Sequence, residues 1–114
     1  MSNEDKQLLL TDLYGRLPYK VKCDIIDLCA ENDNLNKTPL CTYYLLEFEN
    51  GNAEVKPYLR PMSSMTKDEE ETECYLRTYQ ARRYADFCNS KHLDYRGLIE
   101  KGLALEAPEG MYDN

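Results

Sequence analysis

The stretch CTYYLLEFENGNAEVKPYLR, residues 41–60, constrains the fold of this chain more than any other part. Its first half, Tyr43–Phe48, is rich in residues that favour β-strands, and Asn50-Gly51 accepts the positive φ angles that a tight hairpin turn requires. The stretch therefore predicts a β-hairpin. Strand alternation gives it one buried face, made by Tyr44, Leu46, Phe48, Ala53 and Val55.

Two flanking features extend the hairpin into a sheet. Apolar and polar residues alternate from Tyr19 to about Cys29, with a shift of phase after Ile25 that predicts a strand with a bulge or an end there. The run Glu31–Pro39 is rich in Asn, Asp and Pro, which favour turns, and it leads back to a strand that begins near Leu40. Pro57 cannot donate a ladder hydrogen bond, so the last strand should end there or lie at a sheet edge. Three antiparallel strands are expected, with a fourth from Leu103–Leu105.

Helices are predicted before and after this sheet in the sequence. Ser2 can cap a first helix whose leucines recur at helical spacing until Gly15 and Pro18 stop it. Thr66 followed by Glu69 fits a capping box, and no Gly or Pro interrupts the long helix that begins there before Gly97. Arg83 falls within the apolar stripe of that helix, so either a carboxylate partners it or the helix is broken nearby.

The predicted fold is α+β. It comprises an N-terminal helix, a small antiparallel sheet of three or four strands, and a long helix packed across the sheet. A sheet curled into a small barrel is the alternative. The chain has 114 residues, which suits a single domain over residues 1–114, and residues 108–114 are expected to form a flexible tail.

Composition narrows the functional classes. The chain is 42% hydrophobic and 31% charged, as expected for a globular protein, and its net charge of -7 opposes non-specific binding to nucleic acid or anionic membranes. No apolar run approaches the roughly 20 residues that span a bilayer, and the acidic N-terminus does not resemble a signal peptide. We therefore expect a cytoplasmic protein without a membrane partner. Five cysteines without a C-x-x-C pair predict reduced thiols, with no disulfide framework and no metal or other cofactor.

One pair of residues raises the question of catalysis. His92 is the only histidine and lies four residues after Cys88, so a continuing helix would bring thiol and imidazole together. The alternative, a buried thiol beside a helix-end histidine, needs no further partners and is favoured. We predict no catalytic, cofactor-binding or metal-binding residue, and a protein that is not an enzyme.

Two surfaces are candidates for binding. Tyr43, Leu45 and Tyr58 share the polar face of the predicted hairpin, where the tyrosines form either a solvent-exposed cross-strand pair or part of a protein-binding surface. Such a surface could also close as a weak homodimer, with a monomer as the simpler alternative. The second candidate interleaves basic and aromatic residues as nucleic-acid surfaces do, at Arg77, Tyr79, Arg82 and Arg83.

Three blocks of the chain also resemble a known family: Leu8–Lys22 (LLLTDLYGRLPYKVK), Val55–Thr66 (VKPYLRPMSSMT) and His92–Tyr112 (HLDYRGLIEKGLALEAPEGMY). They are similar to short proteins from gut anaerobes, their prophages and mobile elements. The resemblance implies a phage or mobile-element background and brings no activity, cofactor or catalytic residue with it. The leading hypothesis is a small non-enzymatic protein-interaction module. The alternative is a nucleic-acid-associated accessory protein that uses the Arg77–Arg96 region, and free Arg82 and Arg83 beside an exposed Tyr79 would favour it.

Overall fold

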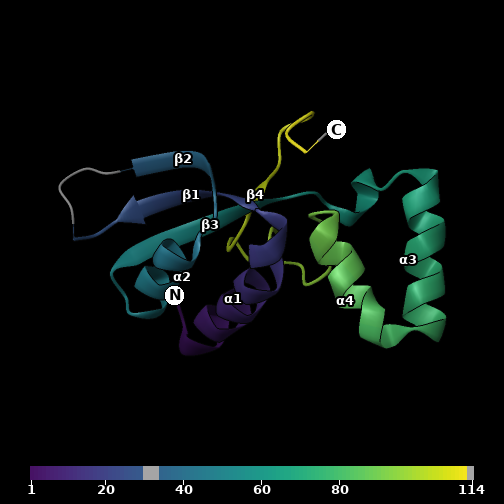
Figure 1. Cartoon of the computed structure of the whole chain (residues 1–114), viewed down its shortest axis with the longest axis horizontal. Coiled ribbons are helices and arrows are strands. Elements are labelled where there is room, and N and C mark those ends of the chain that lie inside the picture. The colour runs from purple at the N-terminus through teal and green to yellow at the C-terminus, as the bar shows by residue number, and fades with distance from the viewer. Residues whose placement is uncertain (30–33, 113–114) are drawn as a thin grey trace.

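The chain folds as an α+β protein that begins with a helix, as predicted, and the computed structural model describes residues 1–29 and 34–112 (Figure 1). Ser2 caps the first helix, because its side-chain oxygen accepts a hydrogen bond from the backbone N–H of Asp5. The helices are α1 (Asn3–Arg16), α2 (Thr42–Glu49), α3 (Lys67–Tyr79) and α4 (Ala81–Ser90), with 3₁₀ turns at Leu17–Tyr19 and Met62–Ser64. The strands are β1 (Lys22–Asp27), β2 (Asn34–Pro39), β3 (Ala53–Leu59) and β4 (Leu105–Glu106).

The sheet has the order β2-β1-β3-β4. β1 pairs antiparallel with both neighbours, and its register with β2 shifts between Cys23 and Ile25, which confirms the predicted irregularity. β2 occupies Asn34–Pro39, so the predicted turn is wrong there, and residues 31–33 lie outside the described residues. β4 runs parallel to β3, so the sheet is mixed rather than antiparallel. The sheet is also open, with β2 and β4 at its two ends, and does not close into the small barrel of the alternative prediction.

The predicted β-hairpin is wrong, because Tyr43–Phe48 lies within helix α2. A short apolar run fits both periodicities, and as a helix it buries Leu45 and Phe48 in the core. Asn50-Gly51 does form a turn, with Gly51 at a φ of 82° and its N–H donating to the Phe48 carbonyl, yet this turn ends a helix. The other half of the stretch is a strand as predicted. It runs through Pro57 to Leu59. Pairing with β4 starts at Tyr58, the residue after Pro57.

One apolar core holds the sheet and two helices together. α1 and α2 lie on the same side of the sheet (Figure 1). Gly15 allows α1 to approach α4 closely, because a Cβ there would lie 2.7 Å from Nδ2 of Asn89. We call α1, α2 and the sheet the body. Its core includes Leu9, Leu13, Val21, Ile25, Leu45, Phe48, Val55, Leu59, Leu98 and Leu103.

Two helices replace the one long helix that was predicted. Gln80 separates α3 from α4 with a φ of -138° and a ψ of 62°, outside the helical region. α4 packs against α1 and against α3, so α3 lies on the outer side of α4, far from the strands (Figure 1). The prediction of a helix across the sheet is therefore wrong. Of the two alternatives for Arg83, the broken helix is confirmed, and this arginine is exposed. We call α3 and α4 together the arm.

The end of the described chain returns to the body. The hydroxyl of Tyr112 donates to the Tyr58 carbonyl and accepts a hydrogen bond from the backbone N–H of Lys22. The predicted flexible tail is wrong at Tyr112, while residues 113–114 lie outside the described residues. Within residues 1–29 and 34–112, no helix has both the length and the apolar character that crossing a membrane requires.

Candidate functional site

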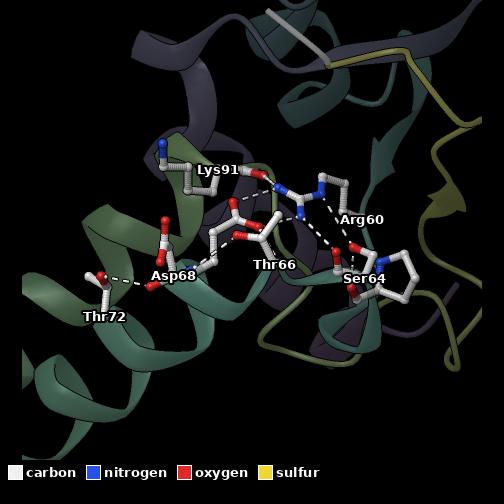
Figure 2. A network of polar contacts seen from close by, with 8 residues as sticks. Arg60, Ser64, Thr66, Asp68, Thr72 and Lys91 are labelled. Carbon is white, nitrogen blue, oxygen red and sulfur yellow. Dashed lines mark hydrogen bonds and ion pairs between the residues drawn. The ribbon is translucent and has the colours of Figure 1, made fainter.

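Arg60, directly after β3, contacts the turn that follows it, the start of α3 and the residue after α4 (Figure 2). Its guanidinium binds the carboxylate of Glu69 in α3 through two hydrogen bonds, of 2.9 Å from Nη1 and 2.7 Å from Nη2. Nη1 also donates to the carbonyl of Lys91, directly after α4, and Nη2 donates to the carbonyl of Ser64. We call these contacts the Arg60 clamp. Because it holds the start of α3 and the end of α4 to β3, the clamp fixes the base of the arm.

The capping box of α3 is confirmed and forms part of the same network. The Thr66 N–H donates to a carboxylate oxygen of Glu69, and the Glu69 N–H donates to the Thr66 hydroxyl oxygen (Figure 2). The hydrogen bonds from Arg60 lower the pKa of Glu69 from its ordinary 4.5 to about 2. Glu69 is therefore a carboxylate at neutral pH, and it binds the arginine and caps the helix at once.

A cavity of about 660 Å³ opens beside the clamp. Lys91 lines it from the end of α4, opposed by the acidic Glu69, Glu106 and Glu109. The volume would admit a small molecule. Basic and acidic side chains both line the cavity, so its charge favours neither an anionic nor a cationic ligand.

His92 lines this cavity but does not join Cys88. Its backbone has a φ of 60°, and its ring stacks on Tyr112 with the ring centroids 3.7 Å apart. Burial lowers the pKa of His92 to about 4 and raises the pKa of the Cys88 thiol. Among the described residues no hydrogen bond links the two side chains. Near neutral pH the histidine is therefore neutral and the thiol protonated, which does not suit a thiolate nucleophile.

The arm presents a large solvent-facing surface. α3 lies wholly within the described residues, and of its 13 residues Glu73 alone is buried. Glu73 accepts hydrogen bonds from Arg77 and, at 2.8 Å, from the hydroxyl of Tyr84 in α4, which joins the two helices. At about 100° per residue, one exposed side of α3 carries four side chains in a row. We call this row the outer face, and it comprises Asp68, Glu71, Tyr75 and Tyr79.

The bend between the two helices carries the basic residues. Tyr79, Arg82 and Arg83 surround a shallow hollow at Gln80, and we call these residues the tip. Tyr79 is 74% exposed, and its ring lies 5.4 Å from that of Tyr75. Within the described part of the chain, Arg82 and Arg83 form no ion pair or side-chain hydrogen bond. The structure thus brings three of the four predicted nucleic-acid residues together, while the fourth, Arg77, is paired with Glu73.

The other predicted surface is not assembled. Tyr43 is 58% exposed on α2, whereas Leu45 is 1% exposed in the core, because helical rather than strand geometry separates them. Tyr58 lies on β3, where its hydroxyl donates to Asp24. The predicted interface at Tyr43, Leu45 and Tyr58 is therefore wrong, and so is the cross-strand tyrosine pair. A homodimer would need a different surface.

Sequence reasoning missed a buried ionic cluster in the body. Arg16 Nε lies 2.7 Å from Asp12 Oδ2, and both side chains are 0% exposed. Arg16 also donates to the Leu93 carbonyl, and Arg96 approaches Asp12 at 3.2 Å. Asp12 and Arg16 are four residues apart within the leucine-rich helix, and this spacing was the available signal. The cluster joins α1 to the segment after α4.

Comparison with known proteins adds no assignment: no protein-family model, curated protein or solved structure matches the chain. The phage or mobile-element background stays a prediction.

Proposed function

We propose that this chain is a non-enzymatic protein-interaction module that binds its partner through the outer face of α3 and the tip. The exposure of α3 carries the proposal, because Glu73 is the one buried residue of this fully described helix. A lone helix of 13 residues is marginal in water. Here polar contacts to Arg60 and Tyr84 hold it in place. The fold thus holds α3 in place, although most of the surface of this helix packs against no other part of the described chain.

The residues on that surface are typical of protein interfaces. Tyrosine supplies contact area together with a hydroxyl, and tyrosine and arginine are both enriched among the residues that dominate binding energy. Tyr75 and Tyr79 are both more than half exposed. Arg82 and Arg83, unpaired within the described residues, are available to carboxylates of a partner.

Site-specific photo-crosslinking tests the proposal. A photoreactive residue in place of Tyr79 should capture a partner in extract of the organism that encodes the chain. The same residue in place of Tyr43, which is also more than half exposed but lies on α2, should not capture it. Capture at both positions, or at neither, would contradict an interaction surface on the arm.

A nucleic-acid-associated role is the second candidate, and the free arginines beside an exposed tyrosine favour it. Single-stranded nucleic acid binds to such surfaces by stacking on aromatic rings and by phosphate contacts. Fluorescence anisotropy of a labelled single strand should then rise with protein at low salt and fall back as salt is added. The double reversal Arg82→Glu with Arg83→Glu should abolish the rise. The matched reversal Lys56→Glu with Lys101→Glu, at two exposed lysines outside the arm, should leave it largely intact.

We also propose a cytoplasmic setting. Cys29, Cys41 and Cys74 are free and exposed, as suits a reducing compartment. Labelling these thiols in intact cells and after lysis would test this, because oxidised cysteines would not react.

A further inference from the structure

The outer face of α3 changes chemical character along its length. Asp68 and Glu71 occupy the first two turns of this face, and both are exposed. Tyr75 and Tyr79 occupy the last two turns, and Arg82 and Arg83 follow at the tip. One end of the surface is therefore acidic, and the other end offers tyrosine hydroxyls and unpaired guanidinium groups.

Such a surface is complementary to itself when it is reversed. A two-fold axis turns a helix antiparallel to its copy and brings each surface patch onto the same patch of the partner. With the axis crossing α3 midway between Asp68 and Tyr79, each acidic end faces the tyrosine–arginine end of the other copy. Asp68 and Glu71 of one copy can then accept hydrogen bonds from Tyr79 and Arg82 of the other, and the two-fold axis makes every such contact twice.

We propose that the partner of the outer face is a second copy of this chain, bound antiparallel through α3 about a two-fold axis. The proposal rests on the protein-interaction function proposed for the same surface. A parallel arrangement would place the arginines of the two tips together and the carboxylates of the two acidic ends together, so like charges would oppose it. Two helices in contact lie about 8–10 Å apart, and α3 can approach a copy this closely because it lies on the outer side of the arm (Figure 1).

Overall charge makes this association weak. Each copy carries a net charge of -7, so two copies repel each other at long range. At about 0.15 M salt the Debye length is about 8 Å, which screens the distant charges more than those in direct contact. The dimer should therefore form at moderate salt and dissociate on dilution.

Reciprocal charge reversal tests the pairing on the full chain. Sedimentation of the unmodified protein from micromolar to near-millimolar concentration should show the mass rise toward the dimer. Either Arg82→Glu with Arg83→Glu, or Asp68→Lys with Glu71→Lys, should abolish the rise, because each makes the two facing ends alike in charge. An equimolar mixture of the two variants should restore a dimer, since both facing ends are then opposite in charge. The reversal Lys56→Glu with Lys101→Glu is the matched control and should dimerise like the unmodified protein.

Disulfide trapping separates the antiparallel from the parallel arrangement. In a background with Cys29, Cys41 and Cys74 replaced by serine, Asp68→Cys mixed with Tyr79→Cys should give a cross-linked dimer on oxidation. Each variant alone should give little, whereas a parallel pair would cross-link in each variant alone. Circular dichroism of every variant should show the helix content of the unmodified protein, which checks that the substitutions have not unfolded it.

Three results would overturn the proposal: a constant monomer mass, charge variants that dimerise normally, or a mixture that stays monomeric. The proposed function fails separately. If the unmodified chain stays monomeric while the photoreactive residue at position 79 captures another protein, the arm is an interaction surface for a different partner. If neither occurs, both proposals are wrong.

Discussion

The body and the arm are stabilised by different kinds of contact. In the body, leucines of α1 and α2 pack on the inner face of the sheet around Ile25 and Val55, which are almost inaccessible to solvent. In the arm, α3 is held by the Arg60 clamp and by hydrogen bonds to Glu73. The body is thus a small hydrophobic core, whereas the outer helix of the arm is attached through polar groups.

This difference has consequences for stability and for function. Burial of apolar area is the main stabilising contribution to a fold of this size, so unfolding the body should unfold the whole chain. A helix with few buried apolar contacts can open locally at a lower free energy. Binding surfaces are often found on such elements, and α3 meets this description.

The largest expected effect concerns the ionic cluster of the body. Asp12→Ala removes the carboxylate that pairs with Arg16, whose side chain is 0% exposed, and leaves the guanidinium buried without a countercharge. We expect the free energy of unfolding to fall by about 3–5 kcal/mol, as for other broken buried pairs. Urea denaturation followed by circular dichroism measures it. Arg77→Ala is the control, because its ion pair with Glu73 is largely exposed on the arginine side and should cost below about 1 kcal/mol. Equal losses would contradict the contrast between body and arm.

The next largest loss of stability is expected when a leucine of the body is replaced, and a leucine of the arm provides the comparison. Leu13→Ala, at a side chain 0% exposed, should destabilise the protein by about 3 kcal/mol through lost burial and a new cavity. Leu76→Ala, at a half-buried position on α3, should cost about 1 kcal/mol or less, because little apolar contact is lost. Thermal unfolding of both variants gives the two values. A larger loss at Leu76 would show that the arm contributes to the core.

A smaller effect is expected at the cap of α3. Thr66→Ala removes the hydroxyl that accepts the Glu69 N–H and should cost about 1 kcal/mol. Thr66→Ser keeps the hydroxyl and should restore most of the loss. Urea titration distinguishes the two, and equal stability of the alanine and serine variants would mean that the cap does not hold the arm.

The smallest effect at neutral pH belongs to His92. Burial lowers its pKa to about 4, from an ordinary 6.5, so the folded protein favours the neutral ring. This contribution is complete above about pH 6.5 and is lost as the pH falls through 4. His92→Asn, which removes the titrating group and tolerates positive φ, should flatten the decline of stability between these values. An unchanged pH profile would show that His92 is not the titrating group.

The sequence predicted those parts of the fold that depend on local rules. The Ser2 cap, the irregularity near Ile25, and the capping box at Thr66 all follow from neighbouring residues and are confirmed. Tyr43–Phe48 was assigned to a strand because a short apolar run fits two periodicities, and its helical state depends on packing against α1 and β3. The break at Gln80 has no Gly or Pro to mark it.

The candidate site was predictable only in part. Tyr79, Arg82 and Arg83 are close in sequence, so their proximity at the tip could be anticipated. The Arg60 clamp could not, because Arg60 reaches across to Glu69 and to the carbonyl that follows α4, and a single sequence does not encode such pairings visibly. Without these tertiary contacts, the acidic start of α3 was only a favourable helix terminus.

Native-state hydrogen exchange of the unmodified protein and of Arg60→Ala tests the central claim most directly. The claim is that α3 belongs to an arm held to β3 by the Arg60 clamp and is separable from the core. In the unmodified protein, amides of α3 should open at a lower free energy than those of α1, β1 and β3. In Arg60→Ala, protection in α3 should fall by a further factor of about 10 or more, corresponding to the loss of roughly 1.5–3 kcal/mol for charged hydrogen bonds, while the body is unchanged. Uniform loss of protection across body and arm, or no loss in α3, would contradict the account.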